Sequence, residues 1–317
     1  MTLEQCLAEQ IVAPGPIIEL TRTPSPYHSS FAIENLKVIL GDSKELDIIF
    51  KNVGRDGLLR EAIQVKPEFI YDPLREIRVY NSILAGAGLD TALCYGSVAD
   101  TGRGRYWLFL EMVRGVELYR VGNLSVWERA AACLARLHQV KVSPETTAHC
   151  HLLNYDGDFY RRWLARARRF CPGAELEWVA KRYEGVIDRL LNLPASFIHG
   201  EFYASNVIVT SSDIYSRVVP IDWEMAAIGP SLMDVAALTA GKWRDEERRQ
   251  LASAYRDQMR QSGTDQQPTD EFVESIEYCR LHQCIQWLGW AADWSPPEEH
   301  AHDWLREAVG IAERLGM

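Results

Sequence analysis

Residues 199–209 read HGEFYASNVIV, and residues 219–223 read VPIDW. Each stretch joins a short β-prone run to polar residues, which places those polar side chains on loops at strand ends. Glu201 stands five residues before Asn206, and Asp222 follows sixteen residues after Asn206. One carboxylate can act as a general base, while an amide and a second carboxylate offer Mg²⁺ the hard oxygen ligands that it prefers. The stretch therefore predicts a phosphoryl-transfer centre.

Together with residues 220–238, PIDWEMAAIGPSLMDVAAL, this stretch resembles the signature of the aminoglycoside phosphotransferase family, which includes choline-kinase-like enzymes. A histidine, a carboxylate and an asparagine at similar spacing also form the catalytic loop of protein kinases. The resemblance extends over LARLH at residues 134–138 and FLEMVRG at residues 109–115. It implies an α+β, bilobal, protein-kinase-like fold, with a small β-rich N-terminal lobe carrying one helix and a larger, mainly helical C-terminal lobe.

The resemblance also implies a role for each residue that matches the signature. Glu201 takes the position of the catalytic base, and His199 is a structural member of the same loop. Asn206 and Asp222 take the positions of the magnesium ligands, and Asp234 supports the loop. The implied reaction is the ATP- or GTP-dependent, Mg²⁺-dependent phosphorylation of a hydroxyl group on a small molecule.

Glu201 departs from the family pattern, because most members carry Asp at this position. The extra methylene moves the carboxylate by ~1.5 Å, and a misplacement of ~1 Å can cost about 100-fold in rate. A loop backbone that is set back would restore the position, since Glu keeps the charge and acceptor capacity of Asp. Two hypotheses follow: an active phosphotransferase, or a kinase-like pseudoenzyme that binds nucleotide or a small ligand without efficient turnover.

The first third of the chain has the pattern of strands, a helix and further strands. Residues 31–53 hold two alternating apolar runs around a turn at residues 41–43, which predicts a hairpin. Residues 74–88, LREIRVYNSILAGAG, have helical spacing and end in glycine. Residues 92–98 and 106–113 are again β-prone and are separated by a glycine-containing turn, which predicts a second hairpin.

Lys51 closes an apolar strand, and Glu76 lies on the helix that follows. In kinases a strand lysine binds nucleotide phosphates and pairs with a helix glutamate, so the resemblance implies this role for the pair. The alternative is an exposed lysine on an edge strand. The resemblance further implies a hinge at residues 111–116, where the backbone of Glu111 and Val113 would face the adenine ring.

The segment that should cover the phosphates, TPSPYHSS at residues 23–30, contains no glycine. Protein kinases have a glycine-rich loop at this place. Ser29 and Ser30 could offer hydroxyl and backbone N–H donors to phosphate oxygens instead. A plain turn explains the segment equally well.

The pattern becomes helical after Gly115. Ser125 and Glu128 have the spacing of a capping box in front of a helix. Apolar periodicity predicts further helices at residues 159–170, 176–191, 245–261 and 270–290, with one β-rich island at residues 195–221. These patterns divide the chain into an N-terminal lobe (1–110), a hinge (111–116) and a helical C-terminal lobe (117–317) that carries the catalytic loop and the substrate site.

Acidic residues are candidates for binding the acceptor, because aminoglycoside-directed members of the family use carboxylates in the helical lobe. Glu224 follows the catalytic Asp222 closely, and three further acids share one helical stripe: Asp270, Glu274 and Glu277. A solvated acidic face is the alternative for the stripe. Trp287, Trp290 and Trp294 could stack on a sugar or a flat hydroxylated ligand, or could belong to the core. The pattern leaves a sugar or a natural-product alcohol as plausible as an aminoglycoside.

The charge and composition of the chain indicate which classes of binding partner to expect. A formal net charge of −10 argues against nucleic-acid binding, which needs a concentrated excess of Lys and Arg. We expect no membrane partner and a cytoplasmic location, because no apolar run approaches ~18 residues and the N-terminus has no signal-peptide pattern. Seven cysteines without a CxxC pair predict reduced, mostly buried thiols. The sequence leaves the oligomeric state open.

Overall fold

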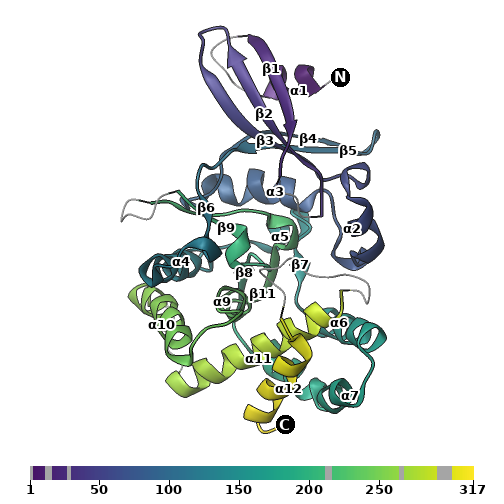
Figure 1. Ribbon diagram of the computed structural model, residues 1–317, viewed down its shortest axis with the longest axis vertical. Helices are drawn as coiled ribbons and strands as arrows, with labels where there is room; N and C mark the ends of the chain where they lie inside the picture. The colour runs from purple at the N-terminus through teal and green to yellow at the C-terminus, as the bar shows by residue number, and fades with distance from the viewer. Residues whose placement is uncertain (1–2, 11–15, 27–29, 211–215, 264–267, 291–301) are drawn as a thin grey trace.

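The computed structural model describes residues 3–10, 16–26, 30–210, 216–263, 268–290 and 302–317. Figure 1 shows a β-sheet lobe above a larger helical lobe. The chain is therefore the α+β, two-lobed molecule that the sequence predicts.

The N-terminal lobe consists of α1 (Leu3–Gln10), β1 (Ile17–Pro24), β2 (Ile33–Leu40), β3 (Glu45–Asn52), α2 (Arg60–Val65), α3 (Arg75–Ser82), β4 (Cys94–Asp100) and β5 (Arg105–Glu111). Its strands form one antiparallel sheet in the order β1-β2-β3-β5-β4. Both predicted hairpins are present, as β2–β3 and β4–β5. The sequence interpretation missed strand β1 and the helices α1 and α2, so this lobe carries more than the one helix expected.

Strand alternation decides where Lys51 points. Ile48 and Phe50 are buried on the face of the sheet that α1 covers, in a small core with Leu3 and Leu7 of that helix. Because successive side chains on a strand point to opposite faces, Lys51 points to the other face, toward α3 and the helical lobe.

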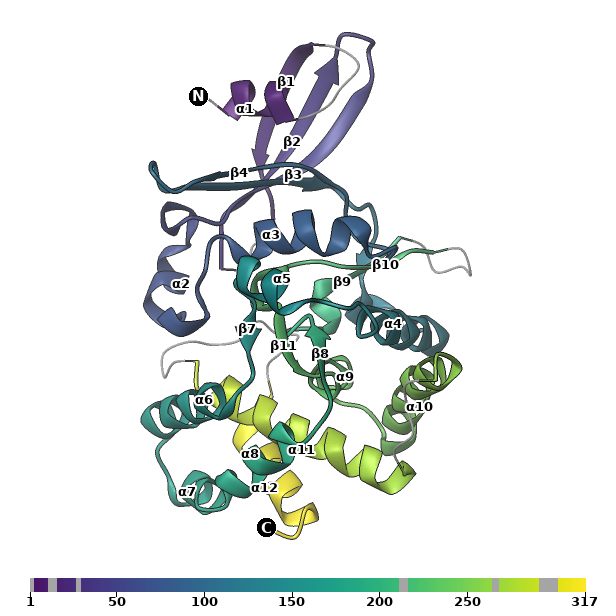
Figure 2. The same ribbon diagram turned by 180° about the vertical axis from the view of Figure 1, so that it is seen from behind.

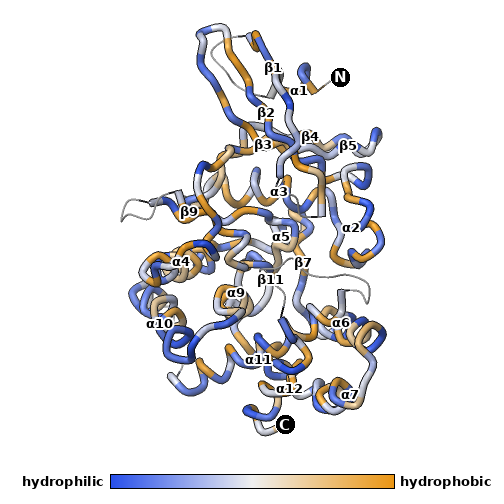
Figure 3. The backbone as a smooth tube through the Cα atoms, viewed as in Figure 1, coloured by the Kyte–Doolittle hydropathy of each residue, from blue (hydrophilic) through white to orange (hydrophobic). Residues whose placement is uncertain are grey.

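The helical lobe contains α4 (Leu124–Leu137), α5 (Pro144–His149), α6 (Gly157–Phe170), α7 (Ala174–Ala180), α8 (Tyr183–Leu191), α9 (Leu232–Leu238), α10 (Asp245–Gln261), α11 (Thr269–Leu288) and α12 (Trp304–Arg314). Figure 2 shows α11 crossing the base of the lobe, where it packs against α6, α8, α9 and α12. The outer helices α4 and α10 alternate hydrophobic and hydrophilic positions along their length in Figure 3, as amphipathic helices do. Among the described residues, no helix is both long enough and apolar enough to cross a membrane.

Two helix predictions were wrong in detail. The N-cap of α4 is Asn123, whose side chain accepts the Ser125 N–H at 3.1 Å, so Ser125 lies inside the first turn and forms no capping box with Glu128. Glu128 instead accepts a hydrogen bond from Gln250 of α10. The predicted helix at 176–191 is two helices, α7 and α8, although neither Pro nor Gly marks the break between them.

Two small three-stranded sheets carry the loops that contain residues 199–206 and 221–226. One has the order β10-β9-β6, from Val218–Pro220, Val207–Val209 and Val116–Glu117. The other has the order β7-β11-β8, from Leu153–Asn154, Ala227–Pro230 and Ala195–Ile198. Six 3₁₀ turns connect the elements of the described chain: Arg55–Gly57, Glu68–Ile70, Leu84–Gly86, Leu118–Arg120, Ala204–Asn206 and Trp223–Met225. All seven cysteines are free thiols.

Gly200 is required by the turn that follows β8. Its φ is +85°, and an added Cβ would lie 2.2 Å from the carbonyl oxygen of Met225. Both the left-handed backbone and the backbone contact exclude a larger residue at this position.

We expect Gly200→Ala to lower the melting temperature of the protein strongly, by the equivalent of about 3 kcal/mol or more, because it combines backbone strain with overlap. Gly104→Ala is the matched control, since Gly104 also has a positive φ (+63°) but nothing within 4 Å of an added Cβ. Thermal denaturation of the two variants measures the difference. Equal losses would show that the Met225 contact does not constrain the loop.

Candidate active site

Lys51 lies between two carboxylates. Its Nζ is 2.7 Å from Glu76 Oε2 and 2.5 Å from Asp222 Oδ1, and its side chain is only 4% exposed. Burial alone would lower the pKa of this ammonium, but the charges of Asp222 and Glu76 outweigh burial and raise the pKa above its ordinary value. The site therefore holds a protonated lysine that joins β3, α3 and the loop after β10.

Asn206 and Asp222 lie side by side at the open end of the β9–β10 pair. Val207 pairs with Pro220, and the N–H of Ile221 donates to the Asn206 carbonyl at 2.9 Å. The Asn206 Nδ2 donates to the Glu201 carbonyl at 3.0 Å, which orients the amide so that its oxygen is the group left for a cation. Asp222 has the left-handed conformation (φ 65°, ψ 71°), a strained state that is concentrated at functional sites.

Asp234 holds the start of the catalytic loop. Its carboxylate accepts the backbone N–H groups of His199 (2.7 Å) and Gly200 (2.9 Å), and it lies 3.1 Å from His138 Nε2. His138 Nδ1 is in turn 2.9 Å from the Tyr255 hydroxyl of α10. Asp234 therefore supports the loop through these hydrogen bonds, as the resemblance implied.

His199 is fully buried and acts inside the loop. Its Nε2 lies 2.9 Å from the Ile221 carbonyl, and its Nδ1 lies 3.3 Å from the Glu201 N–H. Burial lowers the pKa of His199, so the ring is neutral, with Nε2 donating and Nδ1 accepting. His199 thus links the backbone N–H of Glu201 to the carbonyl of Ile221, next to Asp222.

The Glu201 carboxylate has no hydrogen-bond partner among the described residues. Burial, and then the charges of Glu224 and Asp222, raise the pKa of Glu201 to about 8. Lys66 and Lys51 act in the opposite direction. A partly buried carboxyl whose pKa is raised toward the neutral range can exchange a proton there, which is the character of a general acid or base.

The sequence interpretation missed Lys66 and Arg75. Lys66, just after α2, pairs with Glu224 and donates to Ser30 Oγ at 3.0 Å. Arg75, at the first position of α3, donates to the carbonyls of Ile70 (2.8 Å), His151 (2.7 Å) and Glu224 (2.7 Å). Neither residue has a signal in the local sequence, because Glu224, which both contact, lies far away in the chain.

The remaining nucleotide candidates occupy different environments. The Glu111 N–H is bonded to the Leu93 carbonyl (2.8 Å), and its side chain pairs with Arg217 at 2.6 Å, so its own carbonyl is the group that adenine could use. No described residue bonds to the Val113 N–H. Ser30 donates to Glu224 at 3.2 Å, and Ser29 lies outside the described residues.

The structure separates the predicted acidic stripe from the catalytic loop. Asp270 and Glu274 are exposed on α11, which matches the solvated-face alternative. Glu277 is paired with Arg280 (2.5 Å) and Arg314 (2.8 Å). Glu224 alone among the four predicted substrate acids lies beside the centre, where Lys66 and Ser30 engage it.

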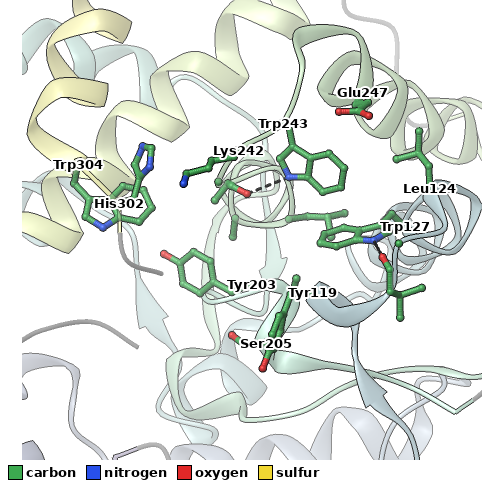
Figure 4. Close-up of a pocket in the computed structure, with 17 residues that line it drawn as sticks. Tyr119, Leu124, Trp127, Tyr203, Ser205, Lys242, Trp243, Glu247, His302 and Trp304 are labelled. Carbon is green, nitrogen blue, oxygen red and sulfur yellow. Dashed lines mark hydrogen bonds between the residues drawn. The ribbon is translucent and has the colours of Figure 1, made fainter. Parts of the chain in front are cut away.

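A cavity of about 460 Å³ borders the catalytic loop, and Figure 4 shows its lining. It reaches Tyr203, Ala204 and Ser205, which separate the base from Asn206. The aromatic side chains on its wall are Tyr119, Trp127, Tyr203, Trp243 and Trp304. Trp127 and Trp243 pack edge to face with ring centroids 4.6 Å apart, and each indole N–H is bonded to a backbone carbonyl.

Of the tryptophans considered from sequence, Trp287 lies just behind the cavity wall. It stacks on Trp304 (centroids 5.3 Å apart) and contacts Tyr203 (5.4 Å). Trp290 packs against Trp163 in the core, and Trp294 lies outside the described residues. The cavity aromatics that the sequence interpretation missed come from four separate segments, so no spacing links them.

The profile of the phosphotransferase enzyme family matches residues 71–272, which is more than half of the chain. The protein belongs to this family. A search of curated protein sequences finds no match.

Solved structures of similar fold include small-molecule kinases. The GDP complex of aminoglycoside 2′-phosphotransferase-IIIa has a TM-score of 0.60 at 14% identity, covering 99% of this chain and 98% of that chain. A Plasmodium vivax ethanolamine kinase has a TM-score of 0.59 at 13% identity, covering 94% and 82%. A macrolide 2′-phosphotransferase from Brachybacterium faecium has a TM-score of 0.59 at 16% identity, covering 98% of each chain. These similarities confirm the kinase-like fold.

The raised pKa of Glu201 predicts a pH-dependent cost in stability. The unfolded side chain loses its proton near pH 4.5, whereas the folded one keeps it up to about pH 8, so this residue destabilises the fold progressively as pH rises through that window. Without metal, we expect Glu201→Gln to melt about 2–5 °C above the natural protein at pH 8.5, and at nearly the same temperature at pH 4.5. Glu274→Gln, on the exposed face of α11, is the control. A difference that is the same at both pH values would contradict the account.

Proposed function

We propose that this protein is an ATP- and Mg²⁺-dependent phosphotransferase that phosphorylates a hydroxyl group of a small molecule. The observation that carries the proposal is the convergence of Lys51, Glu76, Asn206, Asp222 and Glu201 around one centre. Phosphoryl transfer needs a cation on the nucleotide, which Lys51 offers, and a base, which Glu201 offers. Asn206 and Asp222 offer hard oxygen ligands for the metal, and Glu76 orients Lys51. GTP is the alternative donor, since one structural neighbour was solved with GDP.

The residues present fit a magnesium ion. An amide oxygen from Asn206 and a carboxylate from Asp222 are hard ligands, and Lys51 holds Asp222 in the same place. Bound Mg²⁺ would supply charge neutralisation on the phosphate oxygens. Lys51, oriented by Glu76, would bind the inner phosphates of the nucleotide.

The base and the acceptor complete the reaction. Glu201 takes the proton of the acceptor hydroxyl while the hydroxyl oxygen forms a bond to the γ-phosphorus. The bond between that phosphorus and the bridging β,γ-oxygen breaks, and its electron pair leaves with ADP. His199 and Asp234 fix the backbone that presents Glu201, and they take no part in the proton transfer.

The cavity beside residues 203–205 is the proposed acceptor site. An acceptor held there lies next to the loop that carries the base and Asn206. Five Trp and Tyr side chains contribute to the wall, and the one carboxylate among its described residues, Glu247, is bonded to Arg244. This lining favours a sugar or a natural-product alcohol with an apolar face over a polycation, because aromatic rings stack on such faces.

We expect the protein with ATP and Mg²⁺ to phosphorylate at least one member of a panel containing an aminoglycoside, a macrolide, choline, ethanolamine and a nucleoside, as detected by mass spectrometry. Asp222→Ala should abolish both the product and the thermal shift that MgATP induces, because it removes a metal ligand. Glu201→Gln should keep the thermal shift and lose at least about 100-fold in kcat.

The same experiment separates the enzyme from a kinase-like pseudoenzyme. Stabilisation of the natural protein by MgATP without any phosphorylated product across a widened panel would favour the binding protein. Equal activity of the natural protein and Glu201→Gln would remove Glu201 from the role of base.

For an acceptor found in that panel, we expect Trp243→Ala to raise the KM of the acceptor about 10-fold and leave the KM of ATP unchanged, because Trp243 forms part of the cavity wall. Trp178→Ala, in α7 and away from the cavity, is the control. Steady-state kinetics with each substrate varied in turn measures both constants. A rise confined to the KM of ATP would place the acceptor elsewhere.

A further inference from the structure

Lys66 is a second lysine at the catalytic centre whose charge the proposed reaction leaves unused. Its side chain is only 4% exposed, in a lobe where the other phosphate ligand, Lys51, is equally buried. It pairs with Glu224, donates to Ser30 Oγ at 3.0 Å, and Ser30 donates to Glu224 at 3.2 Å. Taking a lysine and its carboxylate partner out of water costs free energy that their pairing often does not repay, so this placement needs a reason.

The two lysines lie on the same aromatic ring. Lys51 Nζ is 5.4 Å from the centroid of Phe31, and Lys66 Nζ is 5.0 Å from it. Both ammonium groups therefore approach one side chain just before β2, next to Ser30 in the chain. Two cations beside one ring are placed to contact different phosphates of one triphosphate chain.

The partners of the two lysines give their order along that chain. Lys51 is held by Glu76 and Asp222, on the side of α3 and the metal ligand. Lys66 is held by Glu224 and by Ser30, which belongs to the segment expected to cover the phosphates. Lys51, beside Asp222, is on the side of the inner phosphates, which leaves the γ-phosphate to Lys66.

The phosphate-covering segment explains why a second cation is useful. Protein kinases cover the phosphates with backbone N–H groups of a glycine-rich loop, and residues 23–30 contain no glycine. A lysine side chain offers a charged donor to the phosphate oxygens in place of those backbone N–H groups, and it needs no close approach of the backbone.

We propose that Lys66 is the γ-phosphate ligand of this protein: it leaves Glu224 when a nucleoside triphosphate binds and stabilises the phosphoryl group during transfer, while Lys51 holds the inner phosphates. This rests on the proposed function of the cleft. Lys66 exchanges one anionic partner for another and stays protonated. The covalent step is the one given above, with the hydroxyl proton going to Glu201 and the electron pair leaving with ADP.

The test is calorimetric binding of MgADP and of Mg²⁺ with AMP-PNP, an ATP analogue that is not turned over. We expect Lys66→Met to weaken AMP-PNP binding by roughly 10- to 100-fold and ADP binding by less than about 3-fold. Lys51→Met should weaken both nucleotides. Lys44→Met, an exposed lysine in the same lobe, is the control and should weaken neither. Equal effects of Lys66→Met on ADP and AMP-PNP, or no effect, would overturn the proposal.

A second variant keeps the test independent of whether Lys66→Met folds. Glu224→Gln removes the anion that competes for Lys66, so we expect AMP-PNP to bind about 3- to 10-fold more tightly and ADP to bind as before. An unchanged or weaker affinity for AMP-PNP would contradict the exchange of partners. Failure of the natural protein to bind either nucleotide would refute the proposed function, whereas normal binding with no selective loss in Lys66→Met would refute only the role of Lys66.

Discussion

The pairing of Lys51 with Glu76 and Asp222 is the interaction on which the rest of the site depends. One buried ammonium joins a strand of the sheet, the helix beneath it and the loop that leaves β10. Removing Lys51 would leave two neighbouring carboxylates without their shared cation in a largely buried place, which is far more costly than the loss of an exposed ion pair. The sheet, α3 and the loop after β10 are therefore joined through one ammonium group.

A second set of contacts fixes the catalytic loop independently of the sheet. Asp234 accepts two consecutive backbone N–H groups, and it does so only because Gly200 can adopt a positive φ. Asp222, in the separate loop after β10, has a strained left-handed backbone. Strain of this kind is maintained by the surrounding structure and is concentrated at functional sites. The Glu201 carboxylate lies beside this loop, where burial and then the charges of Glu224 and Asp222 raise its pKa.

The features that the sequence predicted are those encoded over short distances. The hairpin β2–β3, the helix α10 and the order of Glu201, Asn206 and Asp222 all follow from local patterns. Lys66 and the cavity aromatics could not be predicted, because the fold alone brings distant segments to them. The expected capping box failed for a local reason: Asn123, two residues earlier, reaches the same N–H. The acidic stripe on α11 was a real helical pattern, but helical spacing alone cannot tell a solvated face from a binding face.

The most direct test of phosphoryl transfer at this centre is ³¹P nuclear magnetic resonance of the protein with ATP, Mg²⁺ and a pool of small alcohols. The account predicts that the γ-phosphate signal of ATP falls while signals of ADP and a phosphomonoester rise together, and that Asp222→Ala shows none of this. Persistence of the ATP signal in a sample where calorimetry shows that MgATP is bound would contradict it, and would identify the protein as a nucleotide-binding relative of the phosphotransferases.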